Sequence, residues 1–177
     1  AVTNLKVKND TKSTLKVSWS PAQNAQSYTI GYAKVNTNNY KYIVTNSTSY
    51  TLKGLNLGST YTVAVCANNN IGSTVAAVAS PVKVKLKTPT LKASKKGKST
   101  KLSWSKVSGA SGYKIYRATS KNGKYKLIKT VKGNKTFKYT DKKVYKGTRY
   151  YYSVKAYATK NKKQYYSNNS AKKSVKI

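Results

Sequence analysis

The 177-residue chain has no histidine, no methionine, one cysteine and only two side-chain carboxylates, those of Asp10 and Asp141. Without histidine, the commonest general base and the commonest metal ligand are both missing. The single cysteine, Cys66, cannot form an internal disulfide, a zinc site or an iron–sulfur site. Calcium and magnesium sites usually need several carboxylate oxygens. We therefore expect no catalytic residue, no metal and no cofactor, and we predict that the chain is not an enzyme.

Long hydrophobic runs are also missing. No stretch approaches the roughly 18 apolar residues that a membrane-spanning helix needs, so we predict no transmembrane segment. The chain begins at Ala1 and contains no methionine, whereas a cytosolic protein would normally start with one. Removal of an N-terminal secretory signal is the simplest explanation, and trimming at a domain edge is the alternative. We expect a secreted, extracellular protein that is associated with the cell surface or matrix.

Lysine is what the chain has in excess. There are 36 basic residues against two acidic ones, which gives a formal net charge of +34, and all but Arg117 and Arg149 of the basic residues are lysines. Lysine is a hydrated point charge that favours diffuse attraction to phosphate or carboxylate over bidentate recognition. We predict salt-sensitive and weakly selective binding to a polyanionic polymer or cell surface, without sequence-specific recognition of nucleic acid.

An internal duplication divides the chain into two domains. Three sequence blocks occur twice in the same order, at an offset of 85 residues for the first two blocks and 89 for the third. The copies meet near Pro89, which predicts domains at residues 1–87 and 88–177. The matching aromatic residues are Trp19 and Trp104, Tyr28 and Tyr113, and Tyr61 and Tyr150.

Within each copy, hydrophobic residues alternate with polar ones at a period of two. Leu15, Val17 and Trp19 alternate with Lys16 and Ser18, for example. Runs of this kind are rich in β-branched and aromatic residues and are separated by clusters of Asn, Gly, Ser and Thr. No stretch has the pattern of an amphipathic helix. We predict an all-β protein with about seven short strands in each copy.

The order of these blocks resembles that of fibronectin type III domains. Trp19 and Trp104 are similar to the buried tryptophan of that family's second strand, and Tyr61 and Tyr150 to its tyrosine-corner residue. The second copy is also similar to the fibronectin type III repeats of surface and secreted proteins in Gram-positive bacteria. The resemblance implies two consecutive immunoglobulin-like β-sandwiches. It does not imply one function, because this fold serves adhesion, spacing and scaffolding alike.

The positive charge is concentrated in the second domain. Ten of the 36 basic residues lie in residues 1–87 and the other 26 in residues 88–177, giving net charges of +9 and +25. Alternation places tyrosines and lysines together on the outer face of two neighbouring strands, with a lysine-rich strand at their border. Such a surface could attract phosphate while its rings stack sugars or bases, although tyrosine and lysine also simply suit an exposed sheet. The candidate polyanion-binding residues are Lys114, Tyr116, Arg117, Lys124, Lys126, Tyr151, Lys155 and Tyr157.

The equivalent face of the first domain is nearly uncharged. Alternation places Thr62, Ala64 and Cys66 on this outer face. Flat, uncharged sheet surface is normally avoided in proteins, so we interpret these three residues as candidates for self-association. An exposed Cys66 could form a disulfide between chains; the alternative is a half-buried side chain that acts as a small hydrophobe.

Three functional hypotheses remain. The leading one is a non-enzymatic, secreted adhesion or structural protein whose basic second domain binds cell-wall polymers, extracellular DNA or acidic polysaccharide. The alternative is a homo-oligomer, a self-assembling subunit of an extracellular filament or matrix. A further alternative is that the two domains are accessory modules of a larger surface protein.

Overall fold

The computed structural model describes residues 1–177, and all its regular elements are β-strands. It divides into two compact units, Ala1–Lys85 and Leu86–Ile177. This boundary lies two residues before the expected one, since Leu86 and Lys87 fall in the second unit, whereas Val84 packs in the core of the first. No helix is present with the length and apolarity required to span a membrane. The prediction of an all-β protein with two sandwiches is confirmed.

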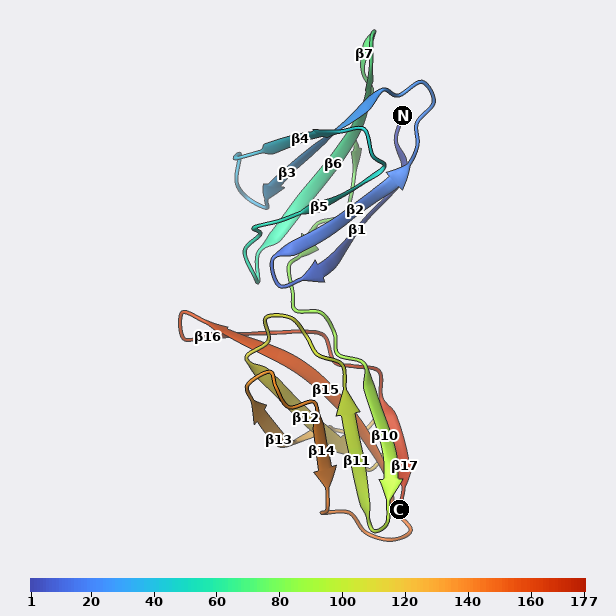
Figure 1. The fold of residues 1–177 in the computed structure, drawn as a ribbon, viewed down its shortest axis with the longest axis vertical. Helices are drawn as coiled ribbons and strands as arrows, with labels where there is room; N and C mark the ends of the chain where they lie inside the picture. The colour runs from blue at the N-terminus through green and yellow to red at the C-terminus, as the bar shows by residue number, and fades with distance from the viewer. The chain divides into compact units, whose positions relative to one another are not determined.

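The first unit consists of two antiparallel sheets (Figure 1). One has the order β1-β2-β5, and the other has the order β4-β3-β6, with three short strands completing it along β6. The strands are β1 (Thr3–Thr11), β2 (Thr14–Ser20), β3 (Ser27–Lys34), β4 (Lys41–Thr45), β5 (Ser49–Leu52), β6 (Thr60–Asn69), β7 (Gly72–Ser73), β8 (Ala77–Val78) and β9 (Val82–Lys83).

The second unit repeats this arrangement with the sheets β10-β11-β14 and β13-β12-β15-β16, and β17 also pairs with β15. Each unit therefore has seven strand positions, the last of which is divided into shorter strands. The strands are β10 (Leu91–Lys96), β11 (Ser99–Trp104), β12 (Gly112–Ala118), β13 (Lys126–Lys132), β14 (Lys138–Asp141), β15 (Arg149–Lys160), β16 (Lys163–Tyr166) and β17 (Lys173–Lys176).

The two cores are built around the same aromatic pair. The rings of Trp19 and Tyr28 lie 5.3 Å apart at 64°, and those of Trp104 and Tyr113 lie 5.5 Å apart at 54°. Each tyrosine hydroxyl accepts a hydrogen bond from a backbone N–H six residues earlier, at 3.0 Å in the first unit and 2.9 Å in the second. The duplication seen in the sequence therefore extends to individual hydrogen bonds.

The tyrosine corner is also present twice. The hydroxyl of Tyr61 accepts a hydrogen bond from the backbone N–H of Asn56 at 3.1 Å, and that of Tyr150 accepts one from Tyr145, also at 3.1 Å. Both tyrosine side chains are buried. Each bond ties the start of a long central strand, β6 or β15, to the connection that precedes it. These two strands supply most of the outer surfaces described below.

Candidate functional site

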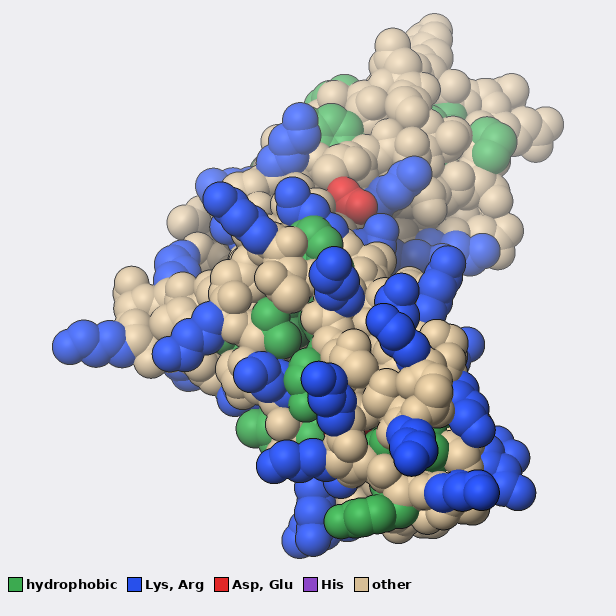
Figure 2. All heavy atoms as spheres, turned by 60° about the horizontal axis from the view of Figure 1, so that its bottom comes forward, with side chains coloured by type: hydrophobic (Ala, Val, Ile, Leu, Met, Phe, Trp, Pro, Cys, Tyr) green, Lys and Arg blue, Asp and Glu red, His purple; other side chains and the backbone are tan.

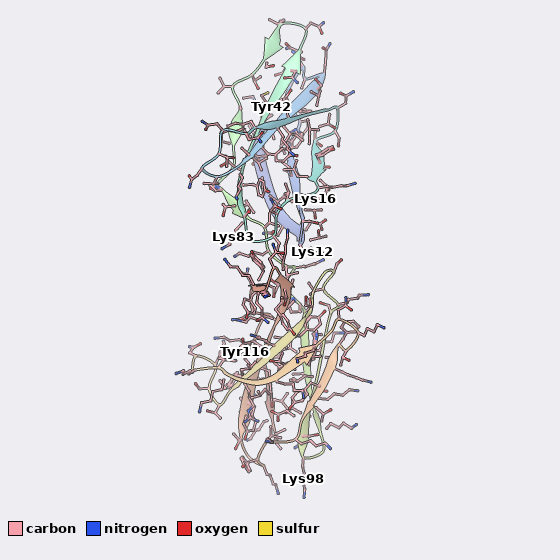
Figure 3. The ribbon with its side chains drawn as sticks, turned by 90° about the vertical axis from the view of Figure 1, so that its left-hand side faces the viewer. Lys12, Lys16, Tyr42, Lys83, Lys98 and Tyr116 are labelled. Atoms are coloured by element: carbon pink, nitrogen blue, oxygen red, sulfur yellow. The ribbon has the colours of Figure 1, made fainter.

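The basic surface of the second unit is centred on the outer face of β12 and β15. Their antiparallel register pairs Lys114 with Lys155 and Tyr116 with Ser153. Directly opposed residues on one face lie close together, so the two lysines repel each other unless neighbouring groups compensate. Tyr116 lies on β12 within this sheet (Figure 3). We call the surface formed by Lys114, Tyr116, Lys155 and the adjoining Tyr166 of β16 the Lys–Tyr face.

Tyrosines hold both ammonium groups of this face in place. The Nζ atom of Lys155 lies 5.1 Å from the ring centroid of Tyr116 and 4.6 Å from that of Tyr166. Lys114 donates hydrogen bonds from Nζ to the hydroxyl of Tyr166 at 2.9 Å and to Oε1 of Gln164 at 3.2 Å. The bond to Tyr166 raises the pKa of Lys114 above its ordinary value. The same bond fixes the position of the Lys114 ammonium group beside the ring of Tyr166.

A cleft of about 210 Å³ opens beside Tyr116 and Lys155. Lys172 also lines it, and its Nζ atom lies 5.2 Å from the ring centroid of Tyr125 and donates a hydrogen bond to the backbone oxygen of Lys121 at 2.7 Å. Each of the two lysines is thus placed over a tyrosine that also lines the cleft. We call this hollow the Lys155–Lys172 cleft; its lining residues are Tyr116, Tyr125, Ser153, Lys155, Asn169, Ser170 and Lys172.

The structure brings together Lys114, Tyr116 and Lys155 of the predicted residues, with Tyr151 half-buried on the same face of β15. The expectation that Tyr157 faces solvent is wrong, since only 6% of this residue is exposed. Its ring lies across Gly112 of β12, where an added Cβ would be 2.6 Å from the tyrosine hydroxyl. Because Gly112 has no side chain, the Tyr157 ring packs against the backbone there and is buried. The ring is therefore not available to stack with a ligand.

Arg117 is also placed differently from the prediction. Its Nη1 atom lies 2.8 Å from Oδ2 of Asp141, which is 1% exposed, and its guanidinium carbon lies 4.9 Å from the ring centroid of Tyr150. The register opposes Arg117 to the core residue Tyr152, so the side chain belongs to the inner face of the sheet. Arg117 is an internal ion-pair partner and not part of the Lys–Tyr face.

The strand beside Tyr116 does not continue the lysine surface as expected. A register shift in the β12–β13 pairing, between Ile115 and Tyr116, places Leu127 opposite Tyr116 and Lys126 opposite Arg117. Leu127 is 49% exposed and therefore borders the Lys–Tyr face in place of a lysine. Lys126 is exposed but lies opposite Arg117 and not on this face, and Lys124 is exposed in the segment before β13.

Three contributors were missed by the sequence reasoning, namely Tyr125, Tyr166 and Lys172. Tyr166 reaches the face because β15 turns directly into β16 through Asn161 and Lys162, whose φ angles are 50° and 60°. Two consecutive positive φ angles define the tight hairpin turn for which asparagine at the first position is a known signal. Tyr125 and Lys172 come from irregular segments and gave no periodic signal.

The outer face of the larger sheet in the first unit lacks charge over most of its area. Thr62, Ala64 and Cys66 are half-buried on β6, as alternation predicts. The Cys66 thiol contacts the backbone oxygen of Thr29 at 3.8 Å. More exposed apolar side chains flank this centre, and the register places them on the same face. They are Tyr42, Val44 and Val78, at 69%, 66% and 65% exposure.

Lysine and arginine side chains are scattered over the visible surface of the second unit rather than gathered in one patch (Figure 2). Lys98, at the tip of the β10–β11 hairpin, illustrates how far the charge extends from the Lys–Tyr face (Figure 3). The only carboxylate side chain among residues 88–177 is that of Asp141, which pairs with Arg117. The remaining basic side chains of this unit therefore have no carboxylate side chain within it to neutralise them.

Fold and surface together define a tandem β-sandwich protein whose second sandwich is strongly basic. Residues 1–83 match the family model of the fibronectin type III domain, and the second unit has the same strand order as the first. The chain is thus built from two consecutive fibronectin type III-like sandwiches. Domains of this family are commonly extracellular adhesion or structural modules and are typically not enzymes.

Several solved structures are similar to the chain. A two-domain fibronectin type III segment of chicken tenascin shares 19% identity, with 99% of each chain covered and a TM-score of 0.49. The FN1–FN3 domains of chicken CNTN1 share 16% identity over 98% of this chain and 66% of that one, with a TM-score of 0.43. A myokine structure shares 22% identity over 48% of this chain and 95% of that one, also with a TM-score of 0.43. No curated protein matches the sequence significantly.

Proposed function

We propose that the second unit attaches this protein to anionic polymers outside the cell, such as cell-wall polymers, extracellular DNA or acidic polysaccharides. One observation carries the proposal: Asp141, the only side-chain carboxylate of residues 88–177, is buried and already paired with Arg117. Since the 26 basic residues of this segment have no other carboxylate side chain within it, a bound polyanion would supply the missing countercharge.

The physical basis of such binding is the release of counterions from the polymer. Each lysine that neutralises a phosphate or sulfate group displaces condensed cations, so affinity falls steeply as salt is added. Lysine offers no planar fork for bidentate recognition, and the scattered charge favours contact with an extended polymer over one compact ligand. Selectivity among anionic polymers would accordingly be low.

Immobilised long-chain inorganic polyphosphate tests the proposal on the intact chain. Four exposed lysines on or beside β13 (Lys124, Lys126, Lys129 and Lys132) are changed together to glutamine. We expect at least a tenfold loss of affinity at about 0.15 M salt, and a salt dependence that is shallower by about one unit of slope for each contacting lysine removed.

The matched control changes four exposed lysines of the first unit to glutamine, namely Lys6, Lys8, Lys12 and Lys16. Both variants lose four positive charges. A difference between their affinities would therefore reflect where the lysines lie and not the total net charge. We expect the control to change affinity by less than about threefold. Equal losses in the two variants would show that net charge alone drives the attraction and would overturn the proposed role of the second unit.

A second candidate function, self-association through the first unit, is favoured by the exposed apolar surface around Ala64. Tyr42, Val44 and Val78 are each about two-thirds exposed on a face that carries no charge at its centre. In a chain of net charge +34, two copies repel each other wherever lysines meet, and this neutral surface is where they can approach.

Sedimentation of the full chain at high concentration tests self-association. We expect Ala64→Lys to shift the protein toward the monomer, because the substitution places like charges in the contact. Ser18→Lys on the outer face of β2, which faces away from this sheet, is the matched control and leaves the distribution unchanged. A wild-type chain that remains strictly monomeric at millimolar concentration would end this hypothesis.

A further inference from the structure

We infer that the Lys155–Lys172 cleft binds a single tetrahedral oxyanion of the polymer, the phosphate diester or sulfate ester group, and that its tyrosines position lysines rather than stack with bases. This inference deepens the proposed function and rests on it. The cleft has room for such a group, since its volume is about 210 Å³, and Lys155 and Lys172 are among its lining residues.

The ammonium groups that line the cleft are held over tyrosine rings. Lys155 Nζ lies over the rings of Tyr116 and Tyr166, and Lys172 Nζ lies over the ring of Tyr125. A cation over an aromatic ring is stabilised while its N–H groups stay available to an anion. A lysine on an open surface loses side-chain entropy when it is fixed by a ligand. Here part of that loss has already occurred in the unliganded protein, which favours anion binding.

A hydroxyl group lies among the lining residues of the cleft. Ser153 is 4% exposed as a whole residue and lines the cleft, so its hydroxyl can donate a hydrogen bond to a group bound there. A bound oxyanion provides an acceptor for Ser153, and its other oxygens remain for Lys155 and Lys172.

The tyrosine rings around the cleft favour recognition of an oxyanion over stacking of a base. A stacked base needs the open face of an aromatic ring. Lysine ammonium groups already lie over the rings of Tyr116, Tyr125 and Tyr166, and Tyr157 is buried against Gly112. The rings are thus occupied by cations of the protein itself. The ligand property recognised here is the charged ester group, whichever polymer carries it.

The experiment is an NMR titration of the full chain with dimethyl phosphate and, in a second arm, methyl sulfate. We expect the Ser153 amide and the Nζ groups of Lys155 and Lys172 to shift together with one dissociation constant. Ser153→Ala weakens binding by about three- to tenfold, as expected for the loss of one hydrogen bond. Tighter binding of one ester than of the other identifies the source of the group.

A matched control lies in the first unit, where Lys34, Lys41 and Lys53 line a hollow of about 260 Å³ with Tyr32. No lysine there is held over a tyrosine ring, and Lys53→Gln leaves the titration unchanged. Equal shifts at both hollows, or an acetate titration as tight as that of the esters, would overturn the inference. Polyphosphate binding could still persist in that case, so failure of the cleft and failure of the proposed function are distinguishable.

Two oligonucleotides test the role of the rings. A single-stranded thymidine 12-mer and an abasic 12-mer carry the same phosphates, and we expect their affinities to agree within about twofold. Base stacking contributes roughly 1–3 kcal/mol per base, so a preference for thymidine of tenfold or more would indicate stacking. If Tyr116→Leu abolished such a preference, the ring would be a stacking platform and the inference would be wrong.

Discussion

The Nη1 atom of Arg117 lies 2.8 Å from Oδ2 of Asp141 and joins the two sheets of the second sandwich. Asp141 ends β14 and Arg117 lies near the end of β12. The same carboxylate oxygen accepts a hydrogen bond from the hydroxyl of Tyr152 at 3.1 Å, and Oδ1 accepts one from the backbone N–H of Lys143 at 3.1 Å. The only acidic residue among residues 88–177 is therefore buried, so every exposed charged side chain of this segment is a lysine or an arginine.

Replacing this carboxylate is predicted to destabilise the second unit. Asp141→Asn removes the negative charge but keeps the size of the side chain, and it leaves the guanidinium of Arg117 without its counter-ion. Breaking a buried pair from one side typically costs 3–5 kcal/mol; because Arg117 is 24% exposed, we expect roughly 2–4 kcal/mol. Hydrogen exchange followed by mass spectrometry measures this for residues 88–177 separately. Asp10→Asn, at an exposed position, should change stability by less than about 0.5 kcal/mol.

The stability of the second unit should fall in alkaline solution because of Tyr152. Burial, as the largest cause, and also Asp141, raise the pKa of Tyr152 well above its ordinary value of 10.0. Above about pH 10 the unfolded chain therefore binds fewer protons than the folded one, so the stability contributed by the neutral phenol is full below that pH and is lost above it. Between about pH 9.5 and 11, we expect the unfolding free energy of Tyr152→Phe to fall by about 1 kcal/mol less than that of the wild type.

The control for this pH series is Tyr145→Phe, since Tyr145 is 77% exposed. Its unfolding free energy should follow that of the wild type at every pH. Parallel curves for Tyr152→Phe and the wild type would contradict the prediction, because they would mean that the buried phenol titrates alike in the folded and unfolded states.

Gly112 should not tolerate a side chain. A Cβ atom there would meet the backbone oxygen of Val131 and lie 2.6 Å from the hydroxyl and 2.8 Å from a ring carbon of Tyr157. We expect Gly112→Ala to destabilise the second unit by roughly 2–3 kcal/mol, measured by chemical denaturation. The double variant with Tyr157→Leu should recover only part of this loss, since the contact with the backbone remains. Full tolerance of alanine would contradict the packing of Tyr157 described above.

The β15–β16 turn offers a stabilising substitution. Lys162 has a φ angle of 60°, a left-handed conformation that costs free energy for a residue with a Cβ. We expect Lys162→Gly to increase the unfolding free energy by about 0.5–1 kcal/mol. Lys163→Gly, at the first residue of β16, removes the same charge and should be destabilising, because Lys163 is paired with Lys160 in the sheet and glycine weakens a strand position. A gain in both variants would instead indicate relief of charge repulsion.

Most of the fold follows from local sequence pattern. The period of two, the repeated tryptophan and tyrosine blocks and the turn residues predict two sandwiches, because strand formation and the burial of alternate side chains are encoded residue by residue. Alternation also placed Lys114, Tyr116 and Lys155 on one outer face. It placed Tyr157 there as well, but it contained no information about the space above Gly112.

By itself the sequence determined the residue inventory, the duplication, the concentration of charge in residues 88–177 and the alternation of inner and outer positions. The tertiary structure decided which charges are available to a ligand. Arg117 turns inward because a buried carboxylate from β14 lies opposite it, and Lys155 is held by Tyr166 because a two-residue turn returns β16 beside β15. Each outcome depends on a particular contact between strands, Arg117 of β12 with Asp141 of β14 and Lys155 of β15 with Tyr166 of β16, which the alternation of inner and outer positions does not specify.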